Sequence, residues 1–134
     1  MKEENIIPGK SIKVLICDDE SRIRQALKAL LLTREIARIN DPSPVIQVIG
    51  EASHGSEAIR QVENLRPDVV IMDASMPGIG GMEATRLIKR KWPQVKVVML
   101  TMYPDTRPAA LDAGVDTFLL KGCLAETLFD AILN

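Results

Sequence analysis

The sequence has no excess of charge of either sign and no long apolar run. Its 134 residues include 17 basic and 18 acidic side chains, which gives a net charge of −1. This balance excludes the strongly basic surface of most nucleic-acid-binding domains, so we expect any DNA-binding function to lie outside this chain. No segment approaches membrane-spanning length and the amino terminus is not a signal peptide, so we expect a cytoplasmic protein without membrane contact.

Cysteine and histidine are scarce, and a glycine-rich phosphate loop is missing. Two cysteines and one histidine do not form the spacing pattern of a zinc site. We expect Cys17, in an apolar run, and Cys123, after a Lys-Gly pair, to be reduced thiols in or near the core. The missing G-x-G-x-x-G pattern argues against binding of NAD or FAD.

The composition is that of an ordinary globular chain, with 46% hydrophobic and 26% charged residues. We expect residues 1–10 to be a flexible polar leader and residues 11–134 to form one domain. Apolar runs alternate with segments of helical spacing along this domain. The predicted strands span 12–17, 45–51, 69–72, 95–100 and 116–120, and the predicted helices span 21–32, 56–65, 82–91, 105–113 and 124–133.

This alternation predicts an α/β fold with a parallel sheet between two layers of helices. Five strands without a phosphate loop favour the flavodoxin-like (βα)5 sandwich with sheet order 2-1-3-4-5 over the dinucleotide-binding order. The first helix is expected to continue beyond Leu32, because Ile36 and Ile39 follow at helical spacing and no breaker precedes Pro42. Its spacing directs Arg24 and Lys28 outward.

Asp73 directly follows the apolar segment 69–72, which has no polar alternation and is therefore predicted to be buried on both faces of the sheet. In open α/β sheets, ligands bind at the carboxyl ends of the strands, so Asp73 is a candidate site residue. The alternative is that Asp73 only starts the turn that contains Met76 and Pro77.

Other strands end in reactive groups too, namely Asp18 and Asp19 after the first, Thr101 after the fourth and Lys121 after the fifth. In the order 2-1-3-4-5 these strand ends are neighbours. Three neighbouring carboxylates repel one another by about 4 kcal/mol per pair at about 4 Å, which predicts a bound cation. Carboxylate ligands favour Mg²⁺, with Mn²⁺ as a substitute.

Lys121 and Thr101 would complete a phosphoryl-transfer site. An ammonium group and a hydroxyl group aimed at the metal can neutralise and hydrogen-bond the oxygens of a phosphoryl group. Asp73 is then the nucleophile, because carboxylates form aspartyl phosphates.

The motifs 14–20, 73–78 and 118–122, together with Thr101, resemble the receiver (CheY-like) domain of two-component response regulators nearly end to end. The resemblance implies that a sensor histidine kinase phosphorylates Asp73. It further implies that Asp19, Asp73 and the backbone carbonyl of Ser75 bind Mg²⁺, with Asp18 acting largely through water. Thr101 and Phe118 would be the switch pair, and Lys121 would bind the phosphoryl group.

Segments 48–52 and 119–122 are similar to the NarL/FixJ subgroup, whose members usually carry a DNA-binding domain. The resemblance implies that phosphorylation changes the surface of helix 105–113, strand 116–120 and helix 124–133, which would control homodimer formation or an output domain in transcription regulation. Tyr103 and Ser75 would flank the phosphoryl group, with Met76 at the edge of the site. Gly80 departs from the subgroup's usual Asp at a helix cap, and the segment Thr33 to Pro44 is longer than typical.

Two other functions remain open. A phosphohydrolase of the haloacid dehalogenase type also forms an aspartyl phosphate, but it has a second Asp two residues after the nucleophile, where this chain has Ser75. A receiver can also act as a phosphorylation-independent interaction module, complete in itself. We expect no enzymatic activity beyond self-phosphorylation and autodephosphorylation.

Overall fold

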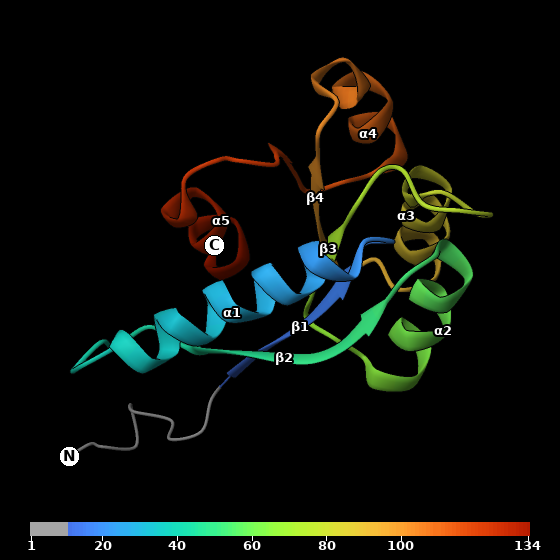
Figure 1. Ribbon diagram of the computed structural model, residues 1–134. Coiled ribbons are helices and arrows are strands. Elements are labelled where there is room, and N and C mark those ends of the chain that lie inside the picture. The colour runs from blue at the N-terminus through green and yellow to red at the C-terminus, as the bar shows by residue number, and fades with distance from the viewer. Residues whose placement is uncertain (1–10) are drawn as a thin grey trace.

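The computed structural model describes residues 11–134, so the predicted leader 1–10 lies outside the described residues. The described chain forms one parallel sheet of five strands in the order β2-β1-β3-β4-β5 (Figure 1). The predicted sheet order is therefore confirmed. The strands are β1 (Ser11–Cys17), β2 (Val45–Ala52), β3 (Val69–Met72), β4 (Lys96–Thr101) and β5 (Thr117–Leu120).

Five α-helices cover the two faces of the sheet (Figure 1). One apolar cluster joins the sheet to α1 and α5, and the other joins it to α2, α3 and α4. Each strand supplies side chains to both clusters in alternation, which is why β3 is buried at every position. The helices are α1 (Ser21–Ala37), α2 (Gly55–Leu65), α3 (Gly81–Lys91), α4 (Arg107–Ala113) and α5 (Ala125–Leu133).

Helix α1 continues past Leu32, as predicted, but it ends at Ala37 rather than near Pro42. Arg38 is already extended, and Asn40 has a left-handed backbone with φ 59°. Side chains of the helix bind this loop, because Arg34 donates to the Ser43 hydroxyl group at 2.7 Å. The loop therefore turns back toward β2 before the prolines are reached.

Helix α4 begins two residues later than predicted. A 3₁₀ turn, Pro104–Thr106, precedes it, and Pro108 lies in its first turn, where a missing N–H costs nothing. Gly114 ends the helix with φ 104°, a left-handed conformation that favours glycine. Among the described residues, no helix combines the length and the apolar character needed to cross a membrane.

Candidate functional site

Asp73 lies at the carboxyl end of β3, in the middle of the sheet. Its backbone N–H donates to the Cys17 carbonyl at 2.9 Å, so the ladder between β1 and β3 continues to the site itself. Asp73 as a whole residue is only 5% exposed. The start of α3 packs directly against it, because a Cβ atom on Gly81 would lie 2.0 Å from the Asp73 carbonyl oxygen. This close approach of α3 to Asp73 therefore requires glycine at position 81.

The end of β1 brings two more carboxylates to the same edge. Asp18 is buried, and its Oδ1 accepts the backbone N–H of Glu20 at 2.9 Å. Asp19 is exposed to solvent. One carboxylate oxygen from each of Asp18, Asp19 and Asp73 lies within 4.8 Å of the others. The convergence predicted from the strand order is therefore present in the structure.

Lys121, after β5, reaches across β4 to these acids. Its Nζ atom lies 2.8 Å from Asp18 Oδ2 and 3.4 Å from Asp73 Oδ1. Its backbone N–H donates to the Thr101 carbonyl at 2.8 Å, so the end of β4 fixes the position of the Lys121 backbone. Within residues 11–134, one ammonium group thus faces three carboxylates.

This excess of negative charge changes the acid–base properties of the site. Burial, and after it the charge of Asp18, raise the pKa of Asp73 from 3.8 to about 6, although Lys121 and the backbone N–H of Ser75 oppose the change. Burial alone would lower the pKa of Lys121, but its pairs with Asp18 and Asp73 outweigh burial and raise it above its ordinary value. Lys121 therefore remains a cation at neutral pH.

Thr101 and Phe118 occupy different depths beside the acids. Thr101 is fully buried at the end of β4, and its hydroxyl oxygen accepts the backbone N–H of Tyr103 at 3.3 Å. Phe118 is half-buried and packs against the apolar cluster that includes Met99 and Ala110. The strand pairing aligns Phe118 with Met99, two residues before Thr101. The two predicted switch residues thus lie on adjacent strands.

A pocket of about 280 Å³ opens onto solvent at this edge. The three exposed residues of the predicted site all line it, namely Asp19, Ser75 and Tyr103. Met76 does not line the pocket; it is 8% exposed and belongs to the core. Two lining residues, Glu20 and Met102, were not predicted, although each adjoins a predicted residue in sequence. The full lining is Asp19, Glu20, Asp73, Ser75, Met102, Tyr103 and Lys121.

The donor set fits a hard cation. The three clustered side chains offer only oxygen atoms, which is the chemistry that Mg²⁺ prefers, and the thiol and imidazole ligands typical of zinc are not part of the cluster. Two of the three acids are almost fully buried. A cation here would offset their mutual repulsion.

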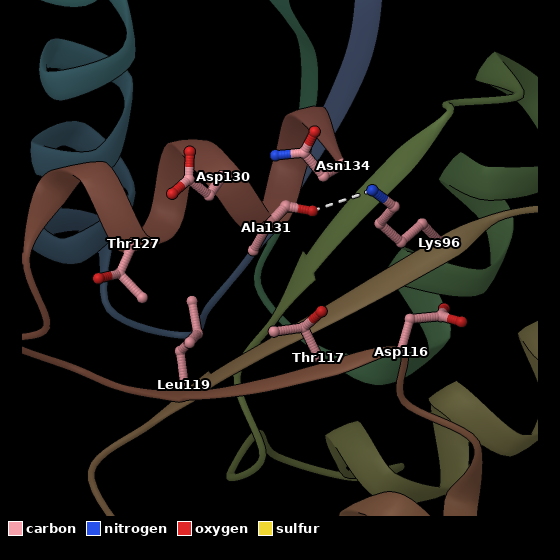
Figure 2. A pocket seen from close by; sticks show the side chains of 8 residues that line it. All are labelled: Lys96, Asp116, Thr117, Leu119, Thr127, Asp130, Ala131 and Asn134. Atoms are coloured by element: carbon pink, nitrogen blue, oxygen red, sulfur yellow. Dashed lines mark hydrogen bonds between the residues drawn. The ribbon is translucent and has the colours of Figure 1, made fainter.

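A larger groove, of about 480 Å³, lies at the opposite, amino-terminal end of β4 and β5 (Figure 2). Two of its charged side chains, Lys96 and Asp116, have partners within the chain. Lys96 Nζ donates to the carbonyls of Ala131 and Ile132 at 3.0 and 3.3 Å, which satisfies the end of α5. Asp116 Oδ2 accepts Lys89 Nζ at 2.9 Å. The acidic pocket is therefore the better candidate for a binding site.

Residues 14–133 match the family model of the response regulator receiver domain. The chain belongs to this receiver family. The resemblance inferred from the sequence is thereby confirmed. The receiver is 39% identical over 124 residues to the response regulator protein VraR of Staphylococcus aureus, an alignment that covers 91% of this chain and 55% of VraR. The chain spans about half the length of the curated relatives that it matches.

Solved structures agree with this assignment. The receiver resembles a two-component response regulator of the LuxR family from Aurantimonas sp., with 29% identity and a TM-score of 0.76 over 91% of this chain and 82% of that one. It also resembles a DNA-binding response regulator of the LuxR family from Staphylococcus aureus, with 26% identity and a TM-score of 0.74 over 90% and 95% of the two chains. TM-scores of this size show that the two structures share the fold of this chain.

Proposed function

We propose that this receiver accepts a phosphoryl group on Asp73 from a sensor histidine kinase, in a reaction that depends on Mg²⁺. The observation that supports this most directly is the cluster of Asp18, Asp19 and Asp73 beside Lys121 at the mouth of a solvent-open pocket. A carboxylate nucleophile, a fixed ammonium group and a cation-binding donor set are the parts that phosphoryl transfer requires.

In the proposed reaction, a carboxylate oxygen of Asp73 attacks the phosphorus of a phosphohistidine. The P–N bond breaks, its electron pair stays on the imidazole, and a P–O bond to Asp73 forms. Lys121 and the Thr101 hydroxyl group hydrogen-bond the phosphoryl oxygens. Asp19, Asp73 and the Ser75 carbonyl would hold Mg²⁺ directly, with Asp18 acting largely through water. The ion would supply positive charge that offsets the charge of the phosphoryl oxygens.

The response would follow from a change at Thr101. Its hydroxyl group now accepts the Tyr103 N–H, and hydrogen bonding to a phosphoryl group would pull it away from this loop. Phe118 could then pack closer to the space that Thr101 leaves. This would shift a pre-existing equilibrium in the surface of α4, β5 and α5, which would control pairing of two copies or release of a DNA-binding output domain.

Intact-protein mass spectrometry tests the acceptor. After incubation with Mg²⁺ and acetyl phosphate, the wild-type chain should gain one phosphoryl group, and Asp73→Asn should gain none. Asp112→Asn is a matched control, because its carboxylate is 80% exposed on α4 and lies outside the pocket lining. A gain that persists in Asp73→Asn would refute the proposal. No gain in the wild-type chain would favour a phosphorylation-independent module, and rapid release of inorganic phosphate from phosphate esters would favour a phosphohydrolase.

A further inference from the structure

Beside the acidic pocket, Arg24 of α1 connects two structural elements. Its Nη1 atom donates to the backbone carbonyl of Asp18 at 2.7 Å, and its Nε atom donates to Glu51 Oε1 of β2 at 2.8 Å. The side chain is only 17% exposed. Helical spacing alone predicts an outward arginine at this position, and that prediction is wrong. Arg24 instead lies folded against the end of β1.

The carbonyl that Arg24 holds belongs to the peptide between Asp18 and Asp19. A peptide unit is planar, so fixing the direction of one carbonyl also fixes the plane that leads into the next residue. The Asp18 backbone N–H is held from the other side, by the Ala52 carbonyl at 3.0 Å. The backbone at Asp18 is therefore fixed at both ends, and Arg24 supplies the contact nearer to Asp19.

Asp19 depends on this contact more than its neighbours do. Asp18 is buried, and its side chain binds Glu20 N–H and Lys121, whereas Asp19 is exposed. Within the described residues, no side-chain hydrogen bond or ion pair fixes the Asp19 carboxylate. Its position near Asp73 is thus set mainly by the backbone that precedes it.

Glu51 anchors Arg24 and also offers a matched control. Its second carboxylate oxygen accepts Lys28 Nζ at 2.5 Å. Arg24 and Lys28 therefore lie on the same helix, pair with the same carboxylate and are both partly buried, at 17% and 33% exposure. Of these two residues of α1, only Arg24 donates a hydrogen bond to Asp18. A residue that merely stabilised α1 against β2 would behave like Lys28.

We propose that Arg24 is a positioning residue for the cation site, which holds the Asp18–Asp19 peptide so that the Asp19 carboxylate stays beside Asp73. This inference rests on the proposed function, because it assigns Arg24 to the same site. Two donors are needed, one for Asp18 and one for Glu51, which the guanidinium group provides and an ammonium group cannot provide in the same geometry.

A Mn²⁺ titration followed by electron paramagnetic resonance measures cation binding without any phosphoryl transfer. The variants are Arg24→Met and Lys28→Met, each of which removes one ion pair with Glu51 and keeps an unbranched side chain. We expect Arg24→Met to weaken Mn²⁺ binding about tenfold, the lower end of the range for residues that orient metal ligands. Lys28→Met should bind Mn²⁺ like the wild-type chain, with a comparable loss of thermal stability.

Equal Mn²⁺ affinities of Arg24→Met and Lys28→Met would overturn the inference and leave the proposed function intact. If Arg24→Met does not fold, Arg24→Lys decides, because it keeps the charge and should still bind Mn²⁺ more weakly than the wild-type chain. An unchanged affinity in Arg24→Lys would again overturn the inference. A wild-type chain that binds no Mn²⁺ and gains no phosphoryl group would overturn both proposals.

Discussion

Acidic side chains have opposite surroundings at the two ends of the sheet. At the amino-terminal end, Asp116 accepts hydrogen bonds from Lys89 Nζ and Val97 N at 2.9 and 2.8 Å, and Asp68 accepts the Lys13 N–H at 2.8 Å. At the carboxyl-terminal end, three carboxylates face one ammonium group. Acids before the strands therefore close turns and stabilise the fold, whereas the acids after the strands repel one another and remain available to bind a cation.

Close backbone packing also distinguishes the two ends, and glycine substitution should show the largest effect. A Cβ atom at Gly81 would clash with backbone atoms of Asp73, whereas at Gly114 it would meet only the Lys89 side chain at 3.4 Å. We expect Gly81→Ala to lower the free energy of unfolding by about 3 kcal/mol. Gly114→Ala should cost about 1 kcal/mol, because only its left-handed backbone resists a side chain.

Urea denaturation of both variants measures these differences. Gly80→Ser serves as a control, because a Cβ atom there meets its nearest neighbour at 3.5 Å and serine caps helices well. Equal costs at positions 81 and 114 would show that α3 can move away from Asp73, contrary to the packing described above.

Neutralising one acid at each end should change stability in opposite directions. In the metal-free protein at pH 7, Asp73→Asn should raise the free energy of unfolding by about 1 to 2 kcal/mol, because it removes a buried charge repelled by Asp18. Asp116→Asn should lower it by about 1 to 2 kcal/mol, because two hydrogen bonds to a carboxylate are weakened. Thermal unfolding in a chelating buffer gives both values. Destabilisation by Asp73→Asn would contradict the proposed repulsion.

The gain from Asp73→Asn should itself depend on pH. The pKa of Asp73 is raised to about 6, so the folded state binds its proton more tightly than the unfolded state does. The stability that this tighter proton binding contributes is complete below the ordinary carboxyl pKa near 3.8, and it is lost as the pH rises through about 6. The stability difference between Asp73→Asn and the wild-type chain should therefore be small at low pH and reach its full size above pH 6. A difference that does not vary with pH would mean that the charge of Asp73 is not its cause.

Added Mg²⁺ should raise the free energy of unfolding by less than Gly81→Ala lowers it. At about ten times the dissociation constant, a ligand that binds only the folded state adds about 1.4 kcal/mol. We expect this gain in the wild-type chain and in Asp116→Asn, but a much smaller one in Asp73→Asn. Calorimetric melting with and without Mg²⁺ measures the gain, and an equal gain in all three chains would place the ion elsewhere.

The sequence allowed most of the fold to be predicted, because buried parallel strands are continuous apolar runs. The segment 69–72 was predicted to the residue. Three other strands differ from the prediction by one residue at one end, and the fourth strand is shifted by one residue at both ends. The end of α1 and the 3₁₀ turn before α4 were not predicted. The end of α1 depends on contacts between the helix and the loop after it, such as that of Arg34 with Ser43, and the 3₁₀ turn depends on loop geometry. Helical spacing in the sequence indicates neither of them.

The site could be predicted for those residues whose position is set by the order of the strands. The ends of neighbouring strands are directly followed by Asp18, Asp73 and Lys121, and the structure brings these three side chains together. The lining residues Glu20 and Met102 and the burial of Met76 depend on how the loops fold after the strands. Arg24 was missed because its partners, a backbone carbonyl and the acid of another strand, leave no pattern in its own helix.

The most direct test of the account is to locate the phosphoryl group. Borohydride reduction converts an aspartyl phosphate to homoserine, which peptide mass spectrometry can assign to one position after treatment with Mg²⁺ and acetyl phosphate. The account predicts homoserine at position 73 and none at positions 18 and 19. Homoserine at either of those two positions, or at none of the three, would contradict it.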